Sequence, residues 1–170
     1  GEDGQDEAGD FDFQIISSSD DLNKALQRLP LGKEAGVIYL DAYMDFPDTI
    51  DSRLVALGIG HDSKGVFLDL LSMGDVPSKL KEIMESSSLI KVCFDSKALY
   101  HALFNLGIKP GGRFMDISLA AYLLNPSQNV RDIEDVFLQE LDIYLRPLAE
   151  LTGKGAKALE LAQLNVDGLA

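Results

Sequence analysis

Three kinds of residue are scarce in this chain, and each scarcity excludes a class of protein. The 170 residues contain no tryptophan, two histidines and one cysteine. Cys93 cannot form an internal disulfide, which excludes a disulfide-stapled secreted scaffold and favours a reducing cytoplasm. No histidine stands near it in the sequence, so we expect a buried structural thiol, not a nucleophile. A zinc site built from cysteine and histidine clusters is also excluded.

Long apolar runs are missing as well. Asp, Lys or Gly interrupts every apolar stretch well before 18 residues, and no basic, apolar leader opens the chain. We therefore expect neither a membrane span nor secretion. There is no G-x-S-x-G elbow and no Walker loop, and the lone Gly58-Ile59-Gly60 lies in a strand-like run. That glycine pair indicates close packing and not a dinucleotide site.

Positive charge is in short supply. Fifteen basic residues face 28 acidic ones, which gives a net charge of −13. Residues 1–12 hold six of the acids and no base, yet the remainder still has 22 acids against 15 bases. A surface of this sign repels phosphate backbones, so we expect the domain alone to bind DNA weakly.

The remaining sequence has the length and the apolar content, 46%, of one globular domain. We interpret residues 1–10 as a disordered acidic linker and residues 11–170 as the domain. Apolar alternation and β-branched runs predict five strands: Phe11–Ile16, Val37–Ala42, Leu54–Gly60, Gly65–Leu71 and Leu89–Phe94. Helical spacing and capping residues predict helices from Ser19 or Asp20 to Pro30, after Asp75, over Ser96–Leu106, over Phe114–Leu124 and after Asn129 and Asp132.

The order of these elements favours an α/β fold with a mixed central sheet flanked by helices in three layers. His61 to Lys64 is predicted to close a hairpin between two of the strands. Phe114–Leu124 is apolar almost all round, which predicts a central helix. The helix after Asp132 is expected to face the core through four apolar residues, namely Ile133, Val136, Phe137 and Leu141.

One stretch, Leu89–Asn129, is the most informative: LIKVCFDSKALYHALFNLGIKPGGRFMDISLAAYLLNPSQN. A strand leads into a Lys-bearing helix, a Gly-Ile turn, a D-x-x-L-x-x-Y-L-L helix and an Asn-Pro stop. This layout resembles the 3′–5′ exonuclease domain of bacterial family A DNA polymerases (DNA polymerase I). The resemblance implies a ribonuclease-H-like fold. It also implies a polymerase domain of the same chain as the partner, with DNA bound through the parent protein.

The resemblance also implies where the acids of such a nuclease should stand. These enzymes hold two divalent metals on four carboxylates, the first two in a D-x-E motif. Here Asp41 falls on the first acid and Tyr43 on the second. The next motif, N-x-x-x-D, becomes Asp95 to Leu99, so a leucine occupies the position of the third ligand and should fill the old pocket. Asp95 is expected to cap a helix instead.

The late part of the family pattern is also weak. Asp116 matches a family residue that binds no metal, and we expect it to cap or anchor the next helix. The window around Tyr144 places Leu148 where the last acid should be, and that acid is either lost or lies after residue 170. Gly153-Lys154-Gly155 resembles a loop of members whose nuclease has decayed.

Asp41, Tyr43 and Leu99 are thus vestigial positions, and we expect no catalytic residue, no bound cofactor and no metal site. The resulting hypothesis is a catalytically inactive exonuclease-like domain that serves as a structural module in DNA replication and repair. One alternative is an active metal-dependent exonuclease with Mg²⁺ on rearranged acids, drawn from Asp41, Asp45, Asp95 and Asp116. Another is a free-standing interaction module. Asp45, Asp48 and Asp51 are otherwise expected in a solvated loop, and His61 and His101 in solvent.

Overall fold

The computed structural model of the chain describes residues 12–26, 36–45, 49–127, 130–147 and 150. The strands are β1 (Asp12–Ile16), β2 (Val37–Asp45), β3 (Arg53–His61), β4 (Lys64–Asp69), β5 (Ile90–Cys93) and β6 (Arg113–Asp116). The helices are α1 (Ser19–Leu26), α2 (Leu70–Met73), α3 (Ser78–Glu85), α4 (Ser96–Asn105), α5 (Ile117–Leu124) and α6 (Ile133–Leu141).

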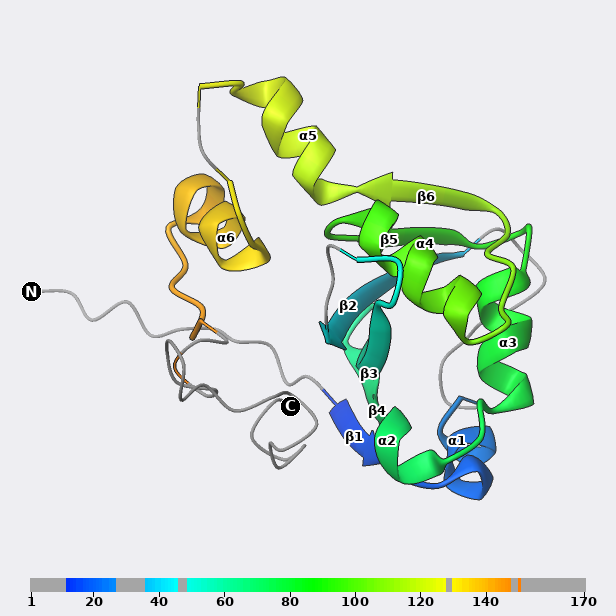
Figure 1. The fold of residues 1–170 in the computed structure, drawn as a ribbon. Helices are drawn as coiled ribbons and strands as arrows, with labels where there is room; N and C mark the ends of the chain where they lie inside the picture. Colours follow the sequence, from blue (N-terminus) through cyan, green and yellow to red (C-terminus); the bar gives the residue numbers. More distant parts are fainter. Residues whose placement is uncertain (1–11, 27–35, 46–48, 128–129, 148–149, 151–170) are drawn as a thin grey trace, which may run out of the picture.

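One mixed sheet joins the six strands in the order β1-β4-β3-β2-β5-β6 (Figure 1). Its centre is an antiparallel meander, because β2 pairs with β3 and β3 with β4 through short connections. The outer pairings, β1 with β4, β2 with β5 and β5 with β6, are parallel. The predicted α/β class and the hairpin after His61 are confirmed.

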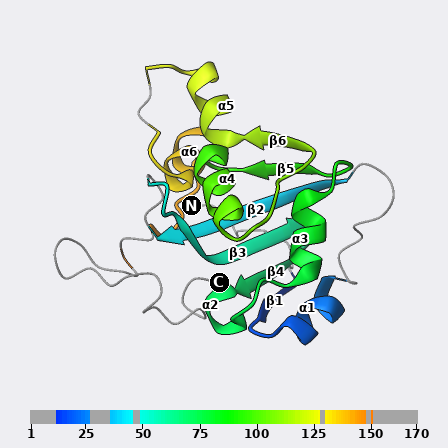
Figure 2. The same cartoon turned by 45° about the vertical axis from the view of Figure 1, so that its right-hand side comes forward.

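Helices cover both faces of the sheet. α1, α3 and α4 lie on one face, α6 lies on the other, and α5 extends away from the end of β6 (Figures 1 and 2). The core lies between the sheet and the first set of helices, where alternate strand residues meet the apolar helix faces. Its fully buried members include Ile38, Leu57, Leu68, Leu80, Met84, Leu99, Leu103 and Ile108.

A lysine in β5 is part of this interior. Lys91 is fully buried, and its Nζ donates hydrogen bonds to the carbonyl oxygens of Ser86 at 2.8 Å and Gly111 at 2.9 Å. The ammonium also lies 5.5 Å from the centre of the Phe114 ring. Burial lowers the pKa of Lys91, since the charged form loses hydration. The side chain thereby ties the loops before β5 and before β6 together.

Several predicted boundaries are corrected at helix ends. Asp69 ends β4 and accepts a hydrogen bond from the backbone N–H of Ser72, so Leu70 and Leu71 belong to α2 and not to the strand. The Ser18 hydroxyl accepts from the backbone N–H of Asp21, which makes Ser18, not Ser19 or Asp20, the residue that caps α1. Asp75 does not cap α3, which begins after Pro77 without a side-chain cap.

The largest correction concerns the stretch predicted as a central helix. Its first residues, with Arg113, form β6, and only Ile117–Leu124 is helical. Ala121 alone is buried in α5, whereas Leu123 and Leu124 are each 77% exposed. An apolar helix can face a partner as well as a core, and the sequence pattern does not distinguish the two.

The helix α6 also packs less closely than predicted. Asp132 caps it by accepting from the backbone N–H of Asp135 at 3.0 Å, as expected. None of its residues is fully buried, and Leu141 is 58% exposed. Among the described residues, no helix is long and apolar enough to cross a membrane. The predicted linker over residues 1–10, Asp48, Asn129, Leu148 and the Gly-Lys-Gly loop lie outside the described residues.

Candidate functional site

The site that the sequence pointed to is the α6-side face of β2 and β3. Asp41 and Tyr43 lie two residues apart on β2 and therefore point to the same face. Asp41 pairs across the sheet with Gly58 of β3, and Gly58 pairs with Phe67 of β4. A Cβ placed on Gly58 would lie 3.4 Å from the Cβ of Asp41, an ordinary van der Waals contact, so a side chain here would enter the space beside Asp41 without a clash.

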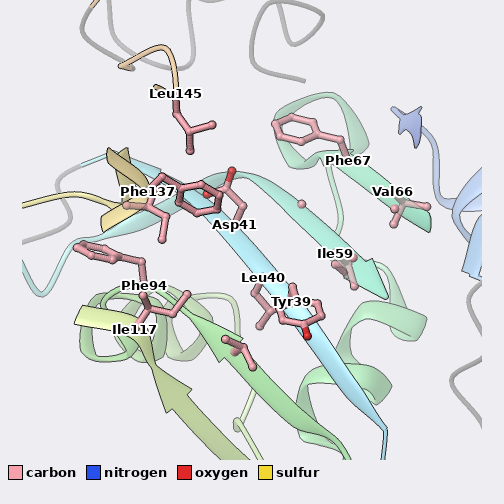
Figure 3. A pocket seen from close by; sticks show the side chains of 15 residues that line it. Tyr39, Leu40, Asp41, Ile59, Val66, Phe67, Phe94, Ile117, Phe137 and Leu145 are labelled. Atoms are coloured by element: carbon pink, nitrogen blue, oxygen red, sulfur yellow. The ribbon is translucent and has the colours of Figure 1, made fainter. Parts of the chain in front are cut away.

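A cavity of about 380 Å³ opens above this part of the sheet (Figure 3). Space is left above the sheet because three neighbouring residues have no side chain: Gly60 pairs with Gly65, and Gly58 lies next to this pair. Its walls come from β2, β3, β4, β5, α5, α6 and the segments after β5 and α6. The side chains around it are almost all apolar: Tyr39, Leu40, Ile59, Val66, Phe67, Val92, Phe94, Ile117, Ile133, Phe137 and Leu145.

Asp41 is the acid that lines this cavity, and it lies in the middle of β2. Desolvation has the largest effect and raises its pKa, a hydrogen bond from the Tyr43 side chain lowers it, and the charge of Glu134 raises it again, for a net increase. Part of the Asp41 surface is nevertheless exposed to solvent, so its desolvation is partial.

Tyr43 stands where the family pattern has its second acid. Burial, followed by the charge and the hydrogen bond of Asp41, raises the pKa of its phenol, which therefore stays protonated at neutral pH. The ring packs edge-on against Phe67, with 5.6 Å between ring centres. Tyr43 thus donates to Asp41 and offers no anionic oxygen.

Leu99 lies elsewhere. It is fully buried in the core cluster from α4 and is not one of the cavity-lining residues. Leu99 is buried but is not a wall of this cavity, and the expectation that it fills an old metal pocket stays a prediction. Leu99 belongs to the hydrophobic core, and the cavity beside Asp41 is open.

Two other candidate acids, Asp95 and Asp116, accept hydrogen bonds at helix starts, as expected. The Asp95 carboxylate accepts from the backbone N–H of Ala98 at 3.0 Å. Asp116 reaches two helices, accepting from the N–H of Ser96 at 2.7 Å and from the N–H and hydroxyl of Ser118. Burial, the largest single effect, raises the pKa of Asp116, but these hydrogen bonds together outweigh it and lower the pKa overall.

The remaining candidates are structural. Asp45 is 8% exposed at the end of β2 and binds Arg53 at 2.7 Å, so its predicted place in a solvated loop is wrong, whereas Asp51 is exposed. His61 is only partly exposed, and its Nδ1 lies 2.8 Å from the carbonyl oxygen of Val37, while His101 is exposed as expected. Cys93 is buried, and burial raises its pKa to about 12.

A pair of Mg²⁺ ions does not fit this donor set. Hard cations need several anionic or carbonyl oxygens in a fixed geometry, and a dinuclear centre must offset four positive charges. The cavity offers Asp41, with Glu134 near enough to act on its pKa, between a protonated phenol and apolar walls. In the described part of the chain, no three His, Cys, Asp or Glu side chains come together as metal ligands.

Sequence reasoning located Asp41 and Tyr43 but missed the other groups of this site. Glu134 lies in the first turn of α6 and belongs to none of the motifs considered in the sequence. Phe94 and Phe137 were expected in strand and core. The one local signal of the cavity was the alternating Gly58 and Gly60, since a strand that omits alternate side chains leaves one face hollow.

Comparison with known proteins identifies the family. The sequence model described as "DNA polymerase I, ribonuclease H-like domain" matches residues 44–164. The chain belongs to this family. A search of curated proteins found no match. The predicted ribonuclease-H-like exonuclease fold of the DNA polymerase I type is thus confirmed.

Solved structures agree on the fold of this ribonuclease H-like domain. Trypanosoma brucei RNase D in complex with RNA U12 matches with a TM-score of 0.71 and 18% identity, over 94% of this chain and 57% of that chain. Escherichia coli RNase D, an exoribonuclease, matches with a TM-score of 0.63 and 17% identity, over 89% of this chain and 39% of that chain. The POL domain of Pol1 from M. smegmatis, in complex with DNA primer-template and dNTP, matches with a TM-score of 0.62 and 23% identity. This match covers 79% of this chain and 23% of that chain. The chain therefore spans less than two thirds of each of these structures.

Proposed function

We propose that this domain is a catalytically inactive 3′–5′ exonuclease-like domain of a DNA polymerase I, kept as a structural module. The observation that carries the proposal is which residues stand at the three positions where the family pattern has acids. Tyr43 is a protonated phenol, Leu99 lies in the core, and Asp41 stands among apolar walls. Phosphodiester hydrolysis by two metals needs carboxylates at these places. The acids of the active alternative are held apart, Asp45 by Arg53 and Asp95 and Asp116 at helix starts.

Nuclease assays test this proposal. We expect no release of nucleotides from single-stranded DNA above background in Mg²⁺ or Mn²⁺, because one lining carboxylate cannot hold the metal pair. The matched control is Asp41→Ala, which removes that carboxylate. Activity that scales with the amount of protein, depends on metal and disappears in Asp41→Ala would establish the active alternative. Activity that survives the substitution would come from a contaminant.

The module is proposed to act by packing against the polymerase domain of the same chain, with DNA bound by the parent protein. Support comes from an apolar surface on α5 and α6, here called the α5–α6 surface. The two helices are in contact, and their exposed members are Leu119, Tyr122, Leu123, Leu124, Leu138 and Leu141. Exposed apolar patches of this kind mark places where another protein surface binds. The net charge of −13 makes DNA a poor occupant.

Hydrogen exchange tests this packing. We expect the amides of α5 to exchange at least about tenfold more slowly when the domain is joined to its polymerase domain than in the domain alone, since covering a helix suppresses its local opening. Leu123→Glu should abolish that difference. Ile50→Glu is the control, because Ile50 is 78% exposed on the connection between β2 and β3, a level close to that of Leu123. Equal exchange in both proteins would contradict the proposed partner surface.

A further inference from the structure

The cavity beside Asp41 has the features of a small-molecule site in its own right. We propose that it binds a small organic ammonium ion, a molecule with an aromatic or branched aliphatic body and one protonated amine. The inference rests on the proposed loss of the metal pair, because Asp41 can bind an amine only where no metal cluster occupies it. It goes beyond that proposal by assigning the decayed site a ligand class.

The shape of the cavity supports an occupant with an apolar body. Ligand sites are concave, mostly apolar and of roughly 300–1,000 Å³, with a few polar groups that fix orientation. This cavity has a volume of about 380 Å³. Its floor is the part of the sheet formed by Gly58, Gly60 and Gly65, which have no side chains. Among the lining side chains only Tyr39 and Asp41 can hydrogen-bond, so a strongly hydrated ligand such as a sugar or a phosphate would lose more than it gains.

The electrostatics of the cavity select a cation. Asp41 lies among the lining side chains, with Phe94 and Phe137 toward one side and Phe67 toward the other (Figure 3). Glu134 adds negative charge close to Asp41. A carboxylate pairs with an ammonium group through a charge-assisted hydrogen bond, and aromatic faces attract the same cation. The negative domain as a whole favours approach of cations and disfavours anions.

A matched series of probes tests the ligand class by calorimetric titration of the domain at neutral pH. The probes are naphthylethylamine, naphthylethanol and naphthylacetate, which share one apolar body and differ in charge. We expect the amine to bind saturably at one site, about tenfold more tightly than the alcohol, and the acetate to bind most weakly. In NMR spectra the amine should shift the backbone amides of Gly58 and Gly60, which form the floor.

Variants separate the charge from the shape. Asp41→Asn should lower the affinity for the amine to that for the alcohol and leave the alcohol unchanged. Gly58→Val should weaken both, because its side chain enters the space between Asp41 and Phe67. Asp75→Asn, at an exposed acid away from the cavity, should change neither. The glycine shifts report the site even if Gly58→Val fails to fold.

Three results would overturn the inference: binding that does not saturate, equal affinity for amine and alcohol, or a preference for the amine that survives Asp41→Asn. A Mn²⁺ titration of the same protein keeps this failure distinct from failure of the proposed function. Tight Mn²⁺ binding that displaces the amine and supports nuclease activity would contradict the inactive domain. If neither Mn²⁺ nor the amine binds, the inferred amine site is wrong and the proposal of an inactive domain stands.

Discussion

Leu99→Asp should destabilise the domain by about 3–5 kcal/mol and should not rebuild a metal site. The substitution restores the acid of the family pattern at a fully buried position in the core cluster. It removes the transfer free energy of a leucine, leaves unfilled volume and buries a carboxylate without a partner. Since small domains have a total stability of about 5–15 kcal/mol, urea denaturation should show a large fall in the midpoint.

Two further variants at the same position separate the causes of this loss. Leu99→Ala should cost about 2–5 kcal/mol through the cavity term alone, and Leu99→Met less than about 1.5 kcal/mol because the volume is nearly kept. An aspartate variant with the midpoint of the native domain and measurable Mn²⁺ binding would show that position 99 still faces the site. That outcome would reverse the assignment of Leu99 to the core.

Asp116→Ala should be the most damaging single loss of an acid, at about 2–4 kcal/mol. The carboxylate accepts from the first turns of both α4 and α5, so its removal leaves donors at two helix starts without a protein partner. A lost N-cap costs about 0.5–2 kcal/mol, and hydrogen bonds to a charged group are worth more than neutral ones. Thermal or urea denaturation measures the change directly.

The pH dependence of this effect has a definite sign. Because the folded-state pKa of Asp116 is lowered, its stabilising contribution is fully present above the unfolded pKa of about 3.9 and is lost as the pH falls through the folded value. The difference in stability between the native domain and Asp116→Ala should therefore shrink below about pH 4. Asp116→Asn should lose about half as much as alanine, because one amide oxygen can still accept at one helix. Asp75→Ala, an exposed acid that caps nothing, should stay within about 0.5 kcal/mol.

The sequence predicted β1 to β5 and most helices because each has a local signal, whereas β6 was missed. Alternation along β2 placed Asp41 and Tyr43 on one face, and the residue types at Asp95, Asp116 and Asp132 predicted their roles as caps. These properties depend on neighbours within a few residues. Helix starts at Ser18 and Pro77 were missed by one or two residues, as expected where several polar residues compete for the cap position.

The rest depends on contacts between distant segments. An apolar helix reads the same whether a core or a partner covers it, so α5 was placed in the centre although Leu123 and Leu124 are exposed. Asp45 was assigned to a loop because its partner Arg53 belongs to the next strand. The cavity was invisible for the same reason: its walls combine side chains from four strands and two helices, and Leu99 joins the core through tertiary packing.

The strand order has a consequence for how the domain assembles. The meander β2-β3-β4 pairs neighbours in sequence within residues 37–69, whereas the parallel pairing of β2 with β5 joins residues 37–40 to 90–93. Short-range pairings close small loops and form sooner than long-range ones. The meander β2-β3-β4 should therefore form first during folding, and α5 and α6 should pack onto the sheet last. The hollow beside Asp41 would then begin as an open groove and acquire its enclosure only in the final stage.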